Sequence, residues 1–231
     1  MQEEPGKLSG FILNAKAFVE EEHKDDTTGH DLYHIERVVK LGCFIAEREN
    51  ADSEIVELAA WLHDLDDWKK LPEGEASKFP LTTKWMNQVG LPIVLRERVF
   101  NILGSLSFKG GKVSADQKTL EGKVVQDADR LDAMGAIGIA RTFTYGGSKN
   151  RPLYVPHIKP HDYHTFEEYK NKLNHTINHF HEKLLLLKDK MNTPTGRLVA
   201  ELRHDRLNRF LKDFYQEWEG DDYAHLFGNS D

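Results

Sequence analysis

Residues 59–70 read AAWLHDLDDWKK, and an apolar segment there gives way abruptly to a histidine and three acidic residues. The positions before His63 are apolar at helical spacing and follow the capping candidates Asp52 and Ser53; they are Ile55, Leu58, Ala59 and Leu62. This spacing predicts a helix with a buried face. A buried helix that ends in His63-Asp64 raises the question of what its polar tip does.

The same helical periodicity runs through nearly the whole chain, with no alternating apolar and polar run and no internal repeat. We therefore predict an all-α fold. A stretch rich in Gly, Pro and His, residues 146–164, divides the chain into a core of residues 7–145 and a C-terminal helical pair of residues 165–220 packed on it. The capping box Thr165-Phe-Glu-Glu168 predicts a long helix whose apolar positions continue to Leu187.

The bulk composition restricts the class of protein. The chain has 231 residues, a formal net charge of −7 and one cysteine. An acidic chain is not built to coat nucleic acid or an anionic membrane, so we expect neither as a partner. With one cysteine, no secretory signal and no apolar run long enough to span a membrane, we expect a cytoplasmic protein. The sequence leaves the oligomeric state open, with a homodimer as one alternative.

Two more polar side chains lie on apolar helix faces. His34 precedes Val38, Leu41 and Ile45 at helical intervals, which turns its imidazole toward the core. Asp129 is in register with the apolar residues Val125 and Ala128 of its predicted helix. Asp127, two residues earlier, is the alternative candidate for the same ligand position. Each residue alone fits a core or capping role, but together they would be costly to bury without a cation. The predicted ligand set for a divalent Mn, Fe, Co, Ni, Zn or Mg ion is His34, His63, Asp64 and Asp129.

This order of residues, H…HD…D, resembles the pattern of the HD superfamily of metal-dependent phosphohydrolases. The stretches GHDLYHIERV, AAWLHDLDDWK, VVQDADRLDAMGAIGIARTF and NHFHEKLLLLKDKMNTPTGR are similar to one branch, which includes nucleoside triphosphate pyrophosphohydrolases. The resemblance spans roughly residues 10–218. It implies an HD-domain helical core with appended C-terminal long helices, and its segment ADRLD favours Asp129 over Asp127 as the ligand.

The resemblance also implies the reaction: hydrolysis of a nucleoside or deoxynucleoside triphosphate at a phosphoanhydride bond, by metal-activated water, to a monophosphate and pyrophosphate. Manganese is the cofactor we expect first. Asp67, one helical turn beyond Asp64, matches the first acid of the HD-x-x-E-D pattern of related alarmone hydrolases and is the predicted catalytic residue. Trp68 replaces the second acid, which argues against alarmone hydrolysis. A nucleotide monophosphatase or phosphodiesterase stays open, as does a non-catalytic metal- or nucleotide-binding module.

Candidate substrate contacts are cationic or titratable side chains close to the ligands in sequence or in neighbouring loops: His30, Arg37, Lys69 and Lys109. Arg37 could hold a substrate phosphate or orient a ligand carboxylate. His30 could contact a leaving-group oxygen or sit in solvent near a helix start. Each lysine is a phosphate contact or a solvated surface charge.

Three further expectations concern the surroundings of the site. Asp66 should face solvent. Arg130 and Asp132 flank Asp129, and one could tether the other in an ion pair. The histidines of the 146–164 loop are His157, His161 and His164, and they predict a polar loop that could cover the site rather than a second metal centre.

Overall fold

The computed structural model describes residues 7–24, 31–66, 79–106, 117–161, 175–224 and 226. Every regular element in these residues is a helix, which confirms the all-α prediction. The N-terminal helices are α1 (Lys7–Glu22), α2 (Leu32–Glu49), α3 (Ser53–Leu62), α4 (Pro80–Gln88), α5 (Ile93–Leu103) and α6 (Leu120–Asp132). They are followed by α7 (Gly135–Ser148), α9 (Thr176–Glu182), the 3₁₀-helix η2 (Leu184–Lys190), α10 (Pro194–Glu219) and α11 (Asp221–Ala224).

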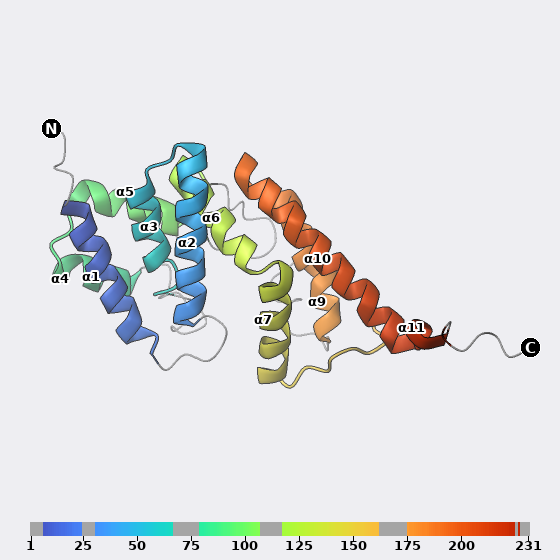
Figure 1. Cartoon of the computed structure of the whole chain (residues 1–231). Helices are drawn as coiled ribbons and strands as arrows, with labels where there is room; N and C mark the ends of the chain where they lie inside the picture. Colours follow the sequence, from blue (N-terminus) through green and yellow to red (C-terminus); the bar gives the residue numbers. More distant parts are fainter. Residues whose placement is uncertain are drawn as a thin grey trace, which may run out of the picture.

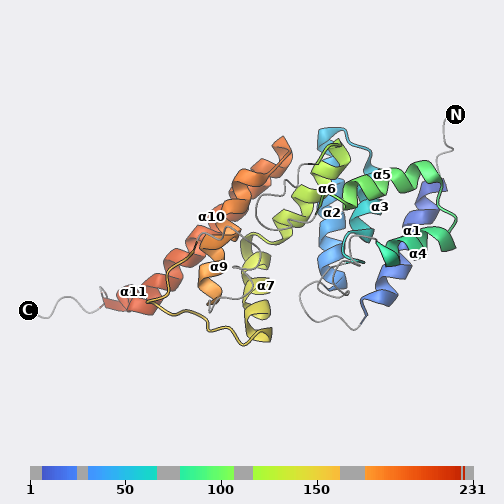
Figure 2. The ribbon, with the colours of Figure 1, turned by 180° about the vertical axis from the view of Figure 1, so that it is seen from behind.

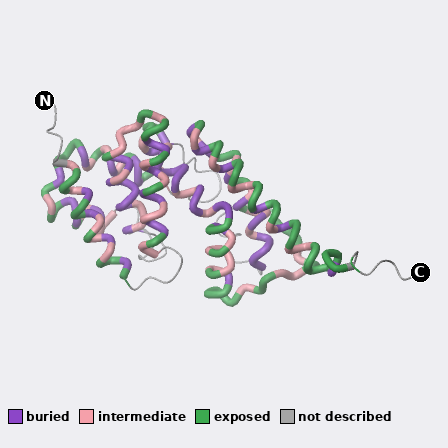
Figure 3. The backbone as a smooth tube through the Cα atoms, in the orientation of Figure 1, coloured by how far each residue is buried: buried purple, intermediate pink, exposed green. Residues whose placement is uncertain are grey.

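Helices α2, α3 and α6 pack against one another at the centre of the N-terminal bundle, with α1 and α5 against α3 (Figure 1). Figure 3 shows buried positions concentrated where these helices meet. The predicted apolar stripe of α3 is part of this core: Ile55, Leu58, Ala59 and Leu62 are all buried. The amphipathic face of each helix thus covers the others, which is how an all-helical chain forms one core.

The C-terminal half is built around the long helix α10, which runs alongside α7 and contacts η2, α6 and α2 (Figures 1 and 2). Phe143 of α7, Phe180 of α9 and Phe210 of α10 form a ring cluster with centroids 5.5–5.8 Å apart. Gly135 starts α7 with a φ of +67°, and an added Cβ would lie 3.1 Å from Cγ of Arg203 on α10. A glycine is therefore required where the chain turns from α6 into α7.

The predicted long helix from residue 165 to Leu187 is not continuous. Residues 162–174, with the capping box, lie outside the described residues, and α9 ends at Glu182 before η2 begins. The apolar positions themselves were predicted well, because Ile177, Phe180, Leu184 and Leu187 are all buried. Leu184 and Leu187 share one face of η2, since a 3₁₀-helix repeats every three residues. The same apolar pattern therefore serves two kinds of helix.

The predicted loop at residue 146 begins later, because α7 continues to Ser148. His157 and His161 are exposed in the described part of this loop, and His164 lies outside it. None of the helices in the described ranges is both long and apolar enough to cross a bilayer.

The expectation that Asp66 faces solvent is wrong. Asp66 is buried, and its carboxylate accepts hydrogen bonds from Leu81 N at 2.8 Å, Thr82 N at 3.0 Å and Thr82 Oγ1 at 2.6 Å. Pro80, the first residue of α4, has no N–H, and the residue before it provides no side-chain cap. Asp66 therefore satisfies the next two backbone donors of α4 from outside the helix.

Asp66→Ala is expected to lower the free energy of unfolding by about 2 kcal/mol, because it removes a cap and leaves a buried hydroxyl unpaired. Urea denaturation measures this change. Asp205→Ala, which truncates an exposed aspartate of α10, is the matched control and should be nearly neutral. Equal stability of the two variants would contradict the capping role.

A buried histidine caps α9. His175 Nδ1 accepts from Asn178 N at 3.2 Å, and Nε2 lies 3.1 Å from the carbonyl oxygen of Ile158. Burial lowers the pKa of His175, and the two contacts assign the neutral ring with its proton on Nε2. Because the folded-state pKa is lowered, this contribution to stability is present above the ordinary pKa of 6.5 and is lost as the pH falls below it.

His175→Asn keeps a capping side chain but cannot titrate. We expect the stability of the wild type to decrease relative to this variant as the pH is lowered from 6.5, measured as unfolding free energies at a series of pH values. A difference between the two proteins that does not change with pH would contradict the assignment.

Candidate metal centre

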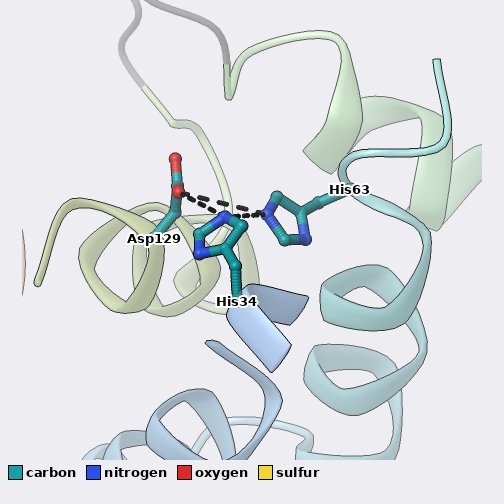
Figure 4. A group of neighbouring side chains, drawn as sticks. All are labelled: His34, His63 and Asp129. Atoms are coloured by element: carbon teal, nitrogen blue, oxygen red, sulfur yellow. Dashed lines mark hydrogen bonds and ion pairs between the residues drawn. The ribbon is translucent and has the colours of Figure 1, made fainter. Parts of the chain in front are cut away.

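Three packed helices bring His34, His63 and Asp129 to one place (Figure 4). His34 lies in the first turn of α2, whose N-cap Asp31 accepts from His34 N at 2.8 Å. His63 is the C-cap of α3, and Asp64 follows it directly. Asp129 comes from the last turn of α6. The helix of the opening stretch therefore ends in His-Asp because its tip faces α2 and α6.

The donor atoms are within reach of a common ion. His34 Nε2 lies 3.3 Å from His63 Nε2, 3.4 Å from Asp64 Oδ2 and 3.6 Å from Asp129 Oδ1. His63 Nε2 lies 3.8 Å from Asp64 Oδ1 and 4.0 Å from Asp129 Oδ1. Two donors that both sit about 2.0–2.2 Å from one ion can be at most about 4.4 Å apart, so the spacings among His34, His63 and Asp129 suit a single cation. Asp64 lies beside this group and presents Oδ2 to His34 and Oδ1 to His63.

Hydrogen bonds fix how each imidazole presents itself. His34 Nδ1 lies 2.8 Å from Asp132 Oδ2, and His63 Nδ1 lies 2.7 Å from the carbonyl oxygen of Ala60. Both partners accept hydrogen bonds only, so each Nδ1 carries a proton. Metal binding requires both rings to be neutral, and the lone pairs of the two Nε2 atoms then lie 3.3 Å apart beside two carboxylates. A cation bound between them turns this repulsive arrangement into a favourable one, and the donor set therefore fits a divalent metal.

The electrostatics of His34 support the same conclusion. Burial acts to lower the pKa of His34, but hydrogen bonds to Asp132 and Asp64 outweigh it and raise that pKa to about 9. The site thus favours a positive charge at this position strongly enough to overcome desolvation. Asp129 leaves the centre accessible, because 40% of its side chain is exposed whereas 1% of His34 is.

Asp132, which the sequence predicted only as a partner of Arg130, holds the His34 ring by its Nδ1, on the side opposite the proposed ligand atom Nε2. Besides His34 Nδ1, its carboxylate accepts from Arg37 Nε at 2.7 Å, Arg37 Nη2 at 3.0 Å and Arg141 Nη1 at 2.6 Å. Burial acts to raise the pKa of Asp132, but the hydrogen bonds from His34 and Arg37 lower it well below its usual range. Asp132 is therefore a permanent carboxylate. Its position three residues after Asp129, on nearly the same helix face, was the available sequence signal.

The remaining candidates separate into placed and undescribed residues. Arg37 donates from Nε and Nη2 to Asp132, and among the described residues no partner is found for its Nη1. Arg130 donates a hydrogen bond to the carbonyl oxygen of Lys190. His30, Asp67, Lys69 and Lys109 lie outside the described residues.

The rival ligand Asp127 faces away from the donors. It is fully buried and accepts from the backbone and side chains of Asn192 and Thr193 at 2.8 Å. An added Cβ on Gly196 would lie 2.4 Å from Asp127 Oδ2. Asp127 thus fastens the start of α10 to α6, and Asp129 is the carboxylate that meets the histidines.

Replacing Asp132 tests whether it orients His34. Asp132→Asn is expected to weaken Mn²⁺ binding by about 10–100-fold, as loss of a hydrogen-bonding partner behind a metal-bound histidine typically does. Calorimetric titration of the metal-free protein measures the affinity, and Asp205→Asn is the control. A purely structural role would lower the melting temperature of Asp132→Asn and leave its Mn²⁺ affinity unchanged.

Comparison with known proteins identifies the family. The profile of the HD domain family matches residues 31–134, which carry all four donors. The protein YpgQ of Bacillus subtilis is 38% identical over 199 residues, which cover 86% of this chain and 89% of YpgQ. A crystal structure of YpgQ in complex with ADP superposes with a TM-score of 0.71 at 34% identity, covering 91% of this chain and 96% of that one.

Two further solved structures are similar over nearly their whole length. A Lactobacillus plantarum protein superposes with a TM-score of 0.81 at 32% identity and covers 95% of this chain and 100% of its own. An HD-superfamily hydrolase of Bacillus thuringiensis superposes with a TM-score of 0.70 at 38% identity, covering 92% of this chain and 99% of its own. The predicted H…HD…D order, the all-helical core and these likenesses agree, and the chain belongs to the HD superfamily of hydrolases.

Proposed function

We propose that this chain is a divalent-metal phosphohydrolase that converts a nucleoside or deoxynucleoside triphosphate to the monophosphate and pyrophosphate. The observation that carries the proposal is the facing pair of Nε2 atoms, 3.3 Å apart, with two carboxylates beside them. The proposed ligands are His34, His63, Asp64 and Asp129, and the proposed ion is Mn²⁺. When bound, the cation supplies Lewis acidity toward a phosphoryl oxygen and lowers the pKa of a water.

The chain's own residues supply positioning and proton transfer. Asp132 and the Ala60 carbonyl hold the two imidazoles with Nε2 toward the site. Arg37 Nη1 is proposed to contact a substrate phosphate, together with His30, Lys69 and Lys109 from the segments outside the described residues. Asp67 is proposed to accept the proton of the attacking water, because it follows Asp64 by three residues and matches the first acid of the HD-x-x-E-D pattern.

A nucleotide substrate is supported by a relative as well as by chemistry. YpgQ, which shares 38% of its residues with this chain over the aligned length, has been crystallised in complex with ADP. A nucleotide carries a chain of negatively charged phosphates. Such a chain suits a site where the proposed cation lies near the guanidinium of Arg37. The choice of the triphosphate, and of cleavage between the α and β phosphates, rests on the resemblance to pyrophosphohydrolases.

Phosphorus NMR of the products tests the proposal directly. The eight common nucleoside and deoxynucleoside triphosphates are incubated with protein and Mn²⁺, with metal-free protein as the control. We expect pyrophosphate and a monophosphate to appear together and only with metal. Orthophosphate and a diphosphate as sole products would reject the cleavage position, and turnover restricted to monophosphates or cyclic nucleotides would reject the substrate class.

A further inference from the structure

A hollow of about 270 Å³ lies between α2, the end of α6, α7 and α10, where Asp132 forms part of the wall. It is a different place from the metal centre. The proposed ligand atom of His34 is Nε2, whereas Nδ1 on the opposite edge of the ring contacts Asp132. The imidazole and the Asp132 carboxylate therefore stand between the hollow and the position of the ion.

Three cationic side chains line the hollow: Arg37, Lys40 and Arg203. The one carboxylate in the wall, Asp132, already accepts four hydrogen bonds, from His34, Arg37 and Arg141. Arg203 Nη1 donates a hydrogen bond to the carbonyl oxygen of Leu131. Within the described ranges, no hydrogen-bond or ion-pair partner is found for the other two nitrogens of that guanidinium, Nε and Nη2, or for the Lys40 ammonium. The same holds for Arg37 Nη1, since Nε and Nη2 of Arg37 donate to Asp132. Several donors on positive groups are thus available to one ligand.

The positive charges crowd one another. Burial lowers the pKa of Arg203, and Arg206 and Arg37 lower it further against the opposing effect of Asp132. This concentration of charge contrasts with the chain as a whole, whose formal net charge is −7. An anion in the hollow would relieve the repulsion and take up the open donors.

The rest of the lining is apolar. Leu41 and Phe44 come from α2 and Ile137 from α7, and Phe44 and Ile137 are 39% and 44% exposed. A site for a bare inorganic anion needs no such wall, whereas pockets that hold organic ligands combine apolar walls with a few placed polar groups. The volume is close to the lower end of such pockets, so it suits one phosphate group and one ring system.

We propose that this hollow is a second binding site, distinct from the metal centre, for a small phosphate monoester with a flat apolar group, the chemistry of a nucleoside monophosphate. The phosphate would take the donors of Lys40 and Arg203, and the ring would lie against Phe44 and Ile137. Binding there requires neither the metal nor turnover, so the proposal stands apart from the proposed hydrolysis.

Calorimetric titration of metal-free protein with adenosine monophosphate and with adenosine, in a chloride buffer of low ionic strength, tests the site. We expect saturable binding of the monophosphate with one site per chain, at least about tenfold tighter than adenosine because its phosphate forms charge-assisted hydrogen bonds. Arg203→Met should weaken the monophosphate by about tenfold or more. Lys40→Gln, at an exposed position, should weaken it by about threefold, and Lys212→Gln on the outer surface of α10 is the matched control.

The metal-centre variant His63→Ala separates this site from the catalytic one. Retained affinity for the monophosphate in His63→Ala, together with the weaker binding expected in Lys40→Gln and Arg203→Met, supports the second site. Loss in His63→Ala with unchanged binding in Lys40→Gln would place the ligand at the metal centre and overturn the proposal. Equal binding of adenosine and its monophosphate, or no saturable heat with either, would overturn it as well.

Discussion

The His63→Ala protein, purified in the presence of Mn²⁺, is expected to lose bound metal and hydrolytic activity together. The variant removes one of four proposed ligands, and its Nε2 is the atom that faces His34 Nε2 at 3.3 Å. The loss of metal affinity should exceed the roughly 10–100-fold that hydrogen-bonding partners behind a ligand contribute, because a direct donor is lost. Elemental analysis of the purified protein and a fixed-time assay for pyrophosphate measure the two effects.

The control for this experiment is His157→Ala, which removes an exposed histidine from the loop after α7. It should retain the metal content and the rate of the wild type. The His63 side chain is only 3% exposed, so its removal could affect folding. Circular dichroism therefore checks that the His63→Ala protein remains helical. Wild-type metal content in a folded His63→Ala protein would contradict the ligand assignment.

Asp67→Asn is expected to lower kcat by about 10²–10⁴-fold, the usual contribution of a positioned general base. The substitution preserves shape and removes the basic carboxylate. Metal content should persist, because the proposed ligands His34, His63, Asp64 and Asp129 are intact. KM should change little, because ground-state binding of the substrate does not require this carboxylate.

Steady-state kinetics at saturating Mn²⁺ distinguish this role from a peripheral one. Asparagine also caps helices well, so a residue that only caps would tolerate the change. A rate within about threefold of the wild type would be far below a general-base effect and would remove Asp67 from the mechanism. Loss of metal along with activity would instead make Asp67 a ligand.

The metal centre could be found from the sequence because its signals are local. His34 and Asp129 lie in register with apolar residues of their own helices, and His63-Asp64 interrupts an apolar run at a helix end. At each of these positions a polar side chain stands where the periodicity of a core helix predicts an apolar one, and a sequence pattern shows this directly. The structure then brings the donor atoms of His34, His63 and Asp129 within 4.8 Å of one another.

What the sequence could not supply depends on contacts between distant segments. Asp66 caps α4 fifteen residues away in sequence, and Asp132 meets Arg37 from a helix 95 residues distant. Both carboxylates look like surface residues when only their neighbours in sequence are considered. The break between α9 and η2 is also invisible in the apolar pattern, because positions three apart stay on one face in either helix.

The central claim is that one cation, held by His34, His63, Asp64 and Asp129, is required for hydrolysis. Titration of metal-free protein with Mn²⁺, at a protein concentration far above the dissociation constant and with pyrophosphate release as the signal, tests it most directly. We predict no release without metal, a rate that rises in proportion to added Mn²⁺, and a plateau at one equivalent per chain. Release by the metal-free protein, or a rate that does not respond to any added divalent metal, would contradict the claim.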